Sequence, residues 1–186
     1  MILRFLVWVL LKNIKKEYAF LFLLPLSKIK VMKITEAIAR HIMEVWEGNW
    51  TEVNLKDVLA EINFKEATAT VPGFTNTIAS LINHLTFYNE VMLQRLNGTA
   101  PQIPGANGFD VPEIKNKPGW QMLKQNCYQS FVLLAEAVKK LPEEKLFTPI
   151  LPTLSETYKS LHGIAEHGHY HTAQIIYLDK WIKYNL

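Results

Sequence analysis

A group of histidines near the C-terminal end is the part of this sequence best suited to chemistry. Residues 166–175 read EHGHYHTAQI, with His167, His169 and His171 within five positions and the carboxylate of Glu166 just before them. Neutral imidazole is a common ligand for zinc and other divalent ions. The stretch is therefore a candidate metal site, and the spacing decides which rings can share an ion.

Helical geometry selects one pair of these histidines. Residues four apart in an α-helix lie about 40° from each other on one face, whereas residues two apart point nearly opposite ways. His167 and His171 therefore share a face, and the apolar residues around them place His171 inside the buried stripe and His167 at its edge. His162, Glu166 and His169 fall on the other face, where we expect solvated side chains.

An inward pair of imidazoles needs further partners, because burying an unpaired polar group costs about 1–3 kcal/mol. A metal ion would satisfy both rings, and a catalytic zinc site typically combines three protein ligands with an exchangeable water. His84, in LINHLTFYNE, lies at the edge of the apolar stripe of an earlier helix and is the expected third ligand, with His41 in reserve. The alternative for both is an ordinary structural histidine at a helix edge.

Other catalytic patterns are absent from the sequence. No glutamate directly follows a histidine, which excludes the H-E-x-x-H motif of zinc peptidases, and neither a phosphate-binding glycine loop nor G-x-S-x-G occurs. Glu166 and His169 have the E-x-x-H spacing of di-iron carboxylate bundles, but such sites need a second copy. The single cysteine, Cys127, lies on an apolar stripe, which predicts an inert core thiol.

The elements that must position these residues are helices. Apolar residues at three- and four-residue spacing predict long helices at about 33–47, 74–97, 120–140 and 153–183. A short turn of helix is expected within 54–62, and Thr153 with Glu156 predicts a capping box at the start of the last helix. Prolines and glycines predict an irregular connection over 99–119. The expected fold is all-α, a four-helix bundle with long inter-helix connections that permit crossovers.

Length indicates one domain, preceded by an unusual segment. The 186 residues suffice for one core and are too few for two ordinary domains, and we assign that domain to residues 32–186. Residues 1–31 contain two apolar runs, 5–11 and 18–26, each shorter than the roughly 20 residues of a membrane-spanning helix. We expect Met32 to be the functional start and 1–31 a mispredicted extension. An interfacial anchor is the alternative, and a signal peptide fits poorly.

Charge and cysteine content limit the partners. The formal net charge is +3, but the basic excess lies within residues 1–31, and the rest of the chain has no basic run, which argues against nucleic-acid binding. One cysteine excludes an intrachain disulfide and suits a reducing cytoplasm. We expect a cytoplasmic protein with a small-molecule substrate and no nucleic acid. Membrane contact is expected only if residues 1–31 are real, and a homodimer is left open.

Two segments, in this order, resemble a known family. Residues 76–98, NTIASLINHLTFYNEVMLQRLNG, are similar to the helix that supplies the first histidine of the DinB/YfiT-like metalloenzymes. Residues 161–178, LHGIAEHGHYHTAQIIYL, are similar to their last helix. The resemblance covers essentially the whole chain from Met32 onward. Thr172 and Ala173 depart from it, because many relatives have Arg-Gly at these positions before the glutamine.

This resemblance implies a bundle in which His84, His167 and His171 bind a divalent metal ion, commonly zinc or nickel, with water completing the shell. It also implies a metal-dependent enzyme of the thiol S-transferase or hydrolase type, with a low-molecular-weight thiol as a co-substrate in the first case. Apart from the resemblance, Tyr88 and Gln174, each about one helical turn from a ligand, are candidate neighbours of the pocket that could hydrogen-bond a ligand, and ordinary packing is the alternative for both. The competing interpretation is a non-catalytic, damage-inducible stress-response protein in which the ion only joins two helices.

Overall fold

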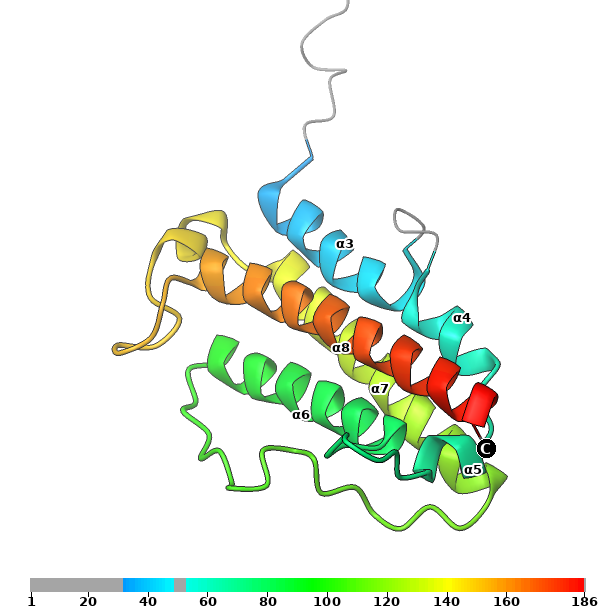
Figure 1. The fold of residues 1–186 in the computed structure, drawn as a ribbon. Coiled ribbons are helices and arrows are strands. Elements are labelled where there is room, and N and C mark those ends of the chain that lie inside the picture. The colour runs from blue at the N-terminus through cyan, green and yellow to red at the C-terminus, as the bar shows by residue number, and fades with distance from the viewer. Residues whose placement is uncertain (1–31, 49–52, 186) are drawn as a thin grey trace, which may run out of the picture. The chain divides into compact units, whose positions relative to one another are not determined.

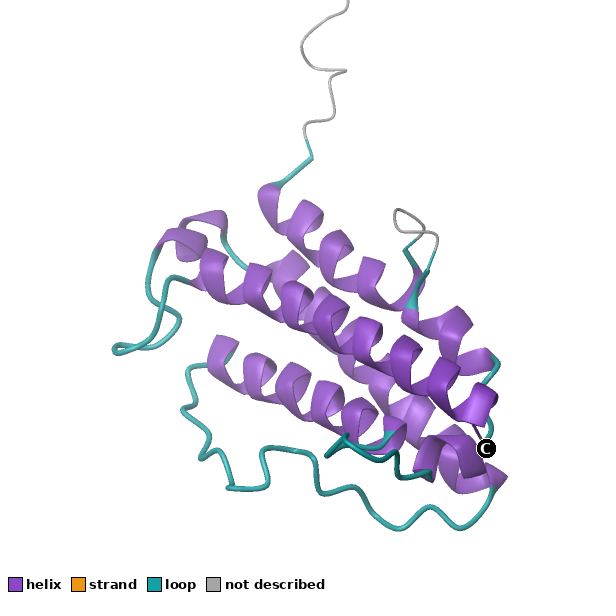
Figure 2. Cartoon of the chain, in the orientation of Figure 1, coloured by secondary structure: helices purple, strands orange, loops and turns teal. Residues whose placement is uncertain are grey.

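The architecture is built from helices alone (Figures 1 and 2). The computed structural model describes residues 32–48 and 53–185, and every regular element within these ranges is helical, which confirms the all-α class. The elements are α3 (Ile34–Glu47), α4 (Leu55–Ala60), α5 (Phe64–Thr68), α6 (Ile78–Leu96), α7 (Lys117–Lys140), the 3-10 helix η2 (Glu143–Phe147) and α8 (Thr157–Asn185).

The four long helices pack as a ring of neighbours. Helix α7 packs against α3 and α6, and α8 packs against the same two helices. The segment between α6 and α7 returns to the end of the domain where α6 begins, so α6 and α7 run in the same direction, as do α3 and α8 (Figure 1). The long connections that the prolines and glycines predicted make this non-sequential arrangement possible.

The core lies between these helices and follows the predicted apolar stripes. In α7 the buried side chains include Leu123, Cys127, Phe131, Leu134 and Val138, all of them predicted. Burial raises the pKa of the Cys127 thiol to about 12, so the sulfur is protonated at neutral pH and unreactive, as expected. The predicted stripe of α8, from Leu161 to Ile182, is buried as well.

Two helices begin at different residues from those predicted, because the chain offers good caps there. Helix α6 begins after Thr77, whose side chain accepts a hydrogen bond from the Ser80 N–H. Phe74 was placed on the stripe of this helix but lies before it and is 49% exposed. Helix α7 begins three residues earlier than predicted, because the Asn116 side chain accepts from the Gly119 N–H.

The predicted capping box of Thr153 and Glu156 is wrong. Helix α8 begins at Thr157, whose N–H and hydroxyl both donate to the carbonyl of Thr148 across a tight loop. An isolated bridge between Pro149 and Glu156 closes the same loop. The N–H of the first residue of α8 therefore finds its acceptor across the loop, without a capping side chain.

Two short helices were not predicted. Helix α5 carries a capping box of its own, in which the Asn63 side chain accepts from the Glu66 N–H and the Glu66 carboxylate accepts from the Asn63 N–H. The 3-10 helix η2 follows α7 directly. Each spans only five residues, which is too short for a helical period to be recognised.

No helix within the described ranges has both the length and the apolar character needed to cross a membrane. The two apolar runs at 5–11 and 18–26 lie outside the described residues. The assignment of residues 1–31 as an extension, and of residues 32–186 as the domain, therefore stays a prediction.

Helices α3 and α8 meet closely at Gly168, where an added Cβ would lie 2.7 Å from Cγ1 of Val45. We expect Gly168→Ala to destabilise the protein by about 1 kcal/mol. Overpacking costs about 1–3 kcal/mol, whereas the higher helix propensity of alanine stabilises the helix by only about 1 kcal/mol. Urea unfolding measures the difference. In a Val45→Ala background the same change should become stabilising, and stabilisation by Gly168→Ala in the wild type would contradict the close contact.

Candidate metal centre

Three histidines from two helices meet between α6 and α8, and we call them the histidine triad. His84 comes from α6, and His167 and His171 come from α8. The Nε2 atom of His167 lies 2.9 Å from Nε2 of His84 and 3.0 Å from Nε2 of His171. Two nitrogens that each lie about 2.1 Å from one ion are themselves about 3 Å apart or slightly more. Both separations therefore agree with a shared ion, and one ligand atom from each of the three histidines lies within 4.8 Å of the others.

The burial of the triad follows the helical stripes. His84 and His171 are 3% and 5% exposed, and His167 is half-buried at the edge of α8, where the periodicity placed it. The His167 ring therefore lies between the two buried rings and the solvent. His167 is the member of the triad nearest to solvent.

The loop between α6 and α7 orients the His84 ring. The Nδ1–H of His84 donates to the backbone carbonyl of Asn107 over 2.6 Å, and the ring stacks on Phe109 with centroids 3.9 Å apart. Asn107 and Gly108 both have positive φ, and a Cβ at Gly108 would lie 2.6 Å from Phe87. The left-handed backbone at these two positions brings the carbonyl onto the ring. These contacts were not predicted, although Asn-Gly is a turn signal.

A second hydrogen-bonded chain orients His171. Its Nδ1–H donates to Oε1 of Gln174 over 2.7 Å, and Nε2 of Gln174 donates to the Tyr170 hydroxyl over 3.0 Å. The hydroxyl of Tyr88 donates to Oδ1 of Asn107 over 2.6 Å, and its ring lies edge-on to His84 and His167. Tyr88 and Gln174, for which ordinary packing was the alternative, are therefore neighbours of the triad. Partners of this kind fix the ring orientation of metal-bound histidines.

The hydrogen bonds determine what the triad can bind. A carbonyl oxygen only accepts, so Nδ1 of His84 and of His171 must each carry the hydrogen, and their Nε2 atoms present lone pairs to His167. Nε2 of His167 can carry one hydrogen and faces two lone pairs. The three rings cannot satisfy one another by hydrogen bonds, whereas one cation accepts all three lone pairs. The donor set thus fits a divalent ion.

The protein environment keeps the triad neutral. Burial lowers the pKa of His84 and of His171 below the usual value. For His167, burial and the neighbouring rings of His171 and His84 lower the pKa to about 4. Neutral imidazole is the form that binds metal, so protons compete weakly with an ion near neutral pH.

The metal-free protein is expected to lose stability as the pH falls from about 6.5 towards 4. In this window an unfolded histidine is protonated, whereas folded His167 with its pKa of about 4 stays neutral, so protons bind preferentially to the unfolded state. We expect this ring to cost about 1 kcal/mol of stability between pH 7 and pH 5 after allowing for solvent screening. Urea unfolding of chelator-treated protein at pH 7 and pH 5 measures it. His167→Asn should show a smaller loss, and an equal loss would contradict the assignment.

Removing the partner of His171 tests its orienting role. We expect Gln174→Leu to weaken metal binding by about 10- to 100-fold, because the Nδ1–H of His171 loses its acceptor. A competition titration against a chromophoric chelator gives the affinity. Gln174→Glu keeps an acceptor oxygen and should retain the affinity. If both variants bind as the wild type does, the hydrogen bond has no role in the site.

His41, the reserve ligand, does not belong to the triad. It lies on the other side of α8, with its ring centroid 5.6 Å from that of His162 and 6.0 Å from that of His169. The expectation that His162 and His169 are solvated is therefore wrong, because both are half-buried against α3. Glu166 is exposed, as predicted. Periodicity separated the faces of α8 but did not show that α3 covers the second one.

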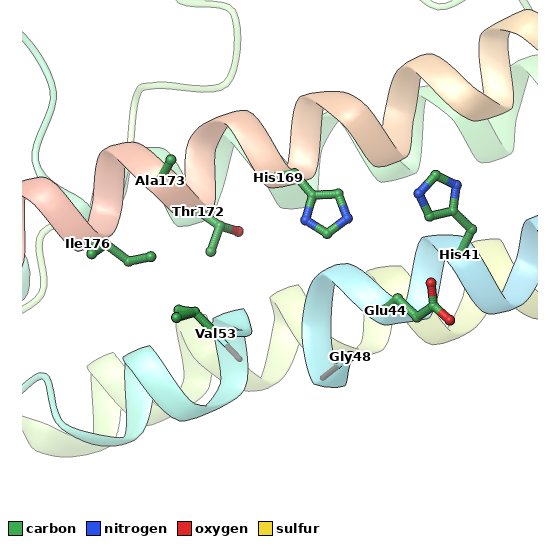
Figure 3. Close-up of a pocket in the computed structure, with 8 residues that line it drawn as sticks. All are labelled: His41, Glu44, Gly48, Val53, His169, Thr172, Ala173 and Ile176. Carbon is green, nitrogen blue, oxygen red and sulfur yellow. The ribbon is translucent and has the colours of Figure 1, made fainter. Parts of the chain in front are cut away.

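A cleft of about 500 Å³ lies between α3 and α8 (Figure 3), and no histidine of the triad lines it. Thr172 and Ala173, the residues that depart from the family pattern, line this cleft. The Thr172 hydroxyl donates to the Gly168 carbonyl within the helix. These two positions therefore lie at the α3–α8 cleft, and the three imidazoles of the triad are present.

Comparison with known proteins agrees with the geometry. A family model described as the DinB superfamily matches residues 47–175. The matched range contains the whole triad and begins after His41. No curated protein and no solved structure matches the chain.

Proposed function

The chain belongs to the DinB superfamily, and on that premise we propose that it binds a divalent metal ion through His84, His167 and His171. The observation that carries the proposal is the meeting of three imidazole nitrogens from two helices, with hydrogen bonds holding two of the rings in the metal-binding tautomer. We also infer that α3, α6, α7 and α8 make up the four-helix bundle of this superfamily.

We propose further that the protein is a metal-dependent enzyme. Three protein ligands leave coordination positions for a water or a substrate, as in catalytic zinc sites. A bound ion would supply a Lewis acid that lowers the pKa of a coordinated thiol or water. A thiol S-transferase and a hydrolase both fit this chemistry, with a small molecule as substrate and, for the transferase, a low-molecular-weight thiol as co-substrate.

The protein's own residues have distinct roles in this proposal. The three imidazoles bind, while the Asn107 carbonyl and the Gln174 side chain hold two of them in place. Phe109 covers one face of the His84 ring and limits the access of water to it. Tyr88 ties the Asn107 side chain to α6 and so fixes the loop against the site.

Zinc and nickel are the proposed ions, because imidazole ligands suit both. A cytoplasmic location agrees with the single buried cysteine, which needs no oxidising compartment. Elemental analysis of protein purified without a histidine tag identifies the ion. Thiol-transfer assays with a panel of electrophiles, and hydrolysis assays in parallel, then test the two reaction types. Protein that carries no transition metal, and takes up none when offered, would overturn the proposal.

A non-catalytic role is the second candidate, because the triad joins α6 to α8 and an ion there would hold the two helices together. Metal content, melting temperature and turnover of His84→Ala distinguish the two. An ion that only stabilises predicts a large fall in melting temperature. A catalytic ion predicts loss of turnover with a smaller thermal effect.

A further inference from the structure

One side of α6 faces the loop that orients His84. Four residues at the spacing i, i+1, i+4 and i+5 lie on this side of the helix and contact residues 107–110: Asn83, His84, Phe87 and Tyr88. His84 is a proposed ligand, and Tyr88 fixes a side chain of the loop. Asn83, the residue directly before the ligand, has no role in the function proposed above.

The part of the loop that meets α6 is a compact turn. We call residues 104–111 the His84 turn. The Asn107 N–H donates to the Pro104 carbonyl over 2.9 Å. The Phe109 N–H donates to the Ala106 carbonyl over the same distance. Backbone groups that bond to one another in this way move together, so the contacts that hold the turn on α6 decide where its carbonyls lie.

The Asn83 side chain fastens the His84 turn to α6. Its Nδ2 amide donates to the Gly108 carbonyl over 3.0 Å and to the Asp110 carbonyl over 3.3 Å. Carbonyl oxygens only accept, so the amide nitrogen of Asn83, not its oxygen, faces the turn. The two hydrogens of one amide nitrogen serve two carbonyls at once, which the single hydrogen of a hydroxyl cannot do.

The carbonyl that Asn83 holds is next to the one that orients the ligand. His84 donates its Nδ1–H to the Asn107 carbonyl, and Asn83 donates to the carbonyl of Gly108, the following residue. The two peptide units share the Cα atom of Gly108, so a shift of one carbonyl displaces the other. The bond to His84 is 2.6 Å long, and a displacement of about 1 Å takes it out of hydrogen-bond range.

Packing supports the turn without fixing the direction of its carbonyls. Phe109 stacks on the His84 ring with centroids 3.9 Å apart, and Phe87 lies close against Gly108. Apolar contacts of this kind are non-directional, whereas hydrogen bonds weaken steeply when their angle changes. The directional contacts of Asn83 are therefore the ones that set the register of the turn on α6.

We propose that Asn83 is a positioning residue for His84. Its amide holds the His84 turn on α6 so that the Asn107 carbonyl accepts the Nδ1–H of the ring, which leaves the Nε2 lone pair for an ion. Asn83 acts through the turn and is not itself a ligand. Its effect on metal affinity rests on the proposed function, whereas its effect on the His84 ring does not.

Asn83→Leu tests this role, because leucine has a similar branched shape and no charge but donates no hydrogen bond. We expect it to weaken Zn²⁺ binding by about 10- to 100-fold, as does the loss of other groups that orient metal-bound histidines. Competition with a chromophoric chelator at pH 7, on full-length protein without a histidine tag, gives the affinity. Asn126→Leu, the same change at an exposed asparagine of α7, should bind Zn²⁺ as the wild type does.

The tautomer of His84 gives a readout that a purely structural role would not change. Long-range ¹H–¹⁵N NMR spectra of chelator-treated protein show which ring nitrogen carries the hydrogen, and His84→Asn identifies the signals of this ring. We expect the Nδ1–H form in the wild type and a mixture of both tautomers in Asn83→Leu. If circular dichroism shows that Asn83→Leu does not fold, Asn83→Ala gives the same comparison.

The two measurements separate this inference from the proposed function. Weaker binding together with a mixed tautomer supports the positioning role. Wild-type affinity, or weaker binding with the wild-type tautomer, overturns it and leaves the proposed function standing. A wild type that takes up no Zn²⁺, with a mixed tautomer in Asn83→Leu, overturns the proposed function but supports the positioning of His84 by Asn83.

Discussion

A His171→Ala variant is expected to bind a divalent ion at the triad about 100- to 1000-fold more weakly than the wild type. A structural zinc site contributes about 10–16 kcal/mol over four ligands, so one ligand accounts for about 3 kcal/mol. His171 is buried, and its ring is fixed by Gln174, so no other side chain can replace it without a backbone shift. Competition with a chromophoric chelator at pH 7 measures the change.

The matched control for this variant is Glu166→Ala. Glu166 lies on the same helix, is exposed and is not one of the three ligands, so its replacement should leave the affinity unchanged. Circular dichroism of both variants without metal shows whether they fold. If folded His171→Ala retains the tight affinity of the wild type, the ion is held elsewhere and the proposed function loses its basis.

Trp120→Ala is expected to lower the free energy of unfolding by about 3–5 kcal/mol. The Trp120 side chain is 1% exposed, and its Nε1–H donates to the carbonyl of Ile62 over 2.8 Å. The variant leaves a large cavity at the start of α7 and an unpaired buried carbonyl, and both are costly. Chemical denaturation in urea, with the slope checked for two-state behaviour, gives the loss.

Met122→Ala, two residues further along α7, serves as the control. The Met122 side chain is 66% exposed, so its truncation should change the stability by less than about 0.5 kcal/mol. The contrast separates burial from any general effect of alanine in this helix. A loss below about 1.5 kcal/mol in Trp120→Ala would mean that α7 does not cover the Ile62 region as described.

The parts of the site that depend on helical periodicity could be predicted from the sequence. The rotation of about 100° per residue placed His167 and His171 on one face, and the same argument pointed to His84 on α6. Gln174 and Tyr88 were candidate neighbours of the site, because each lies about one helical turn from a ligand. What could not be predicted is the role of Asn107 and Phe109, because contacts of an irregular loop leave no periodic pattern.

The errors have a common physical origin. Each long helix touches two others, and periodicity shows that a face is covered without showing by which helix. His41 was therefore assigned as a reserve for the triad and His169 to solvent, whereas the parallel packing of α3 and α8 brings them together. In the same way, Thr153 and Glu156 have the residue types of a capping box. The helix nevertheless begins at Thr157, because the Thr157 N–H donates to the Thr148 carbonyl across the loop.

The oxygen that orients His84 belongs to the main chain of residue 107, not to a side chain. Point substitutions along the loop cannot delete this acceptor, provided that position 107 tolerates its φ of 54°. A single insertion or deletion between Gly98 and Asn107 would displace it by up to about 3.5 Å. The residue types in this loop should therefore vary in evolution while its length stays constant. A designer can replace the loop sequence as long as the number of residues is kept.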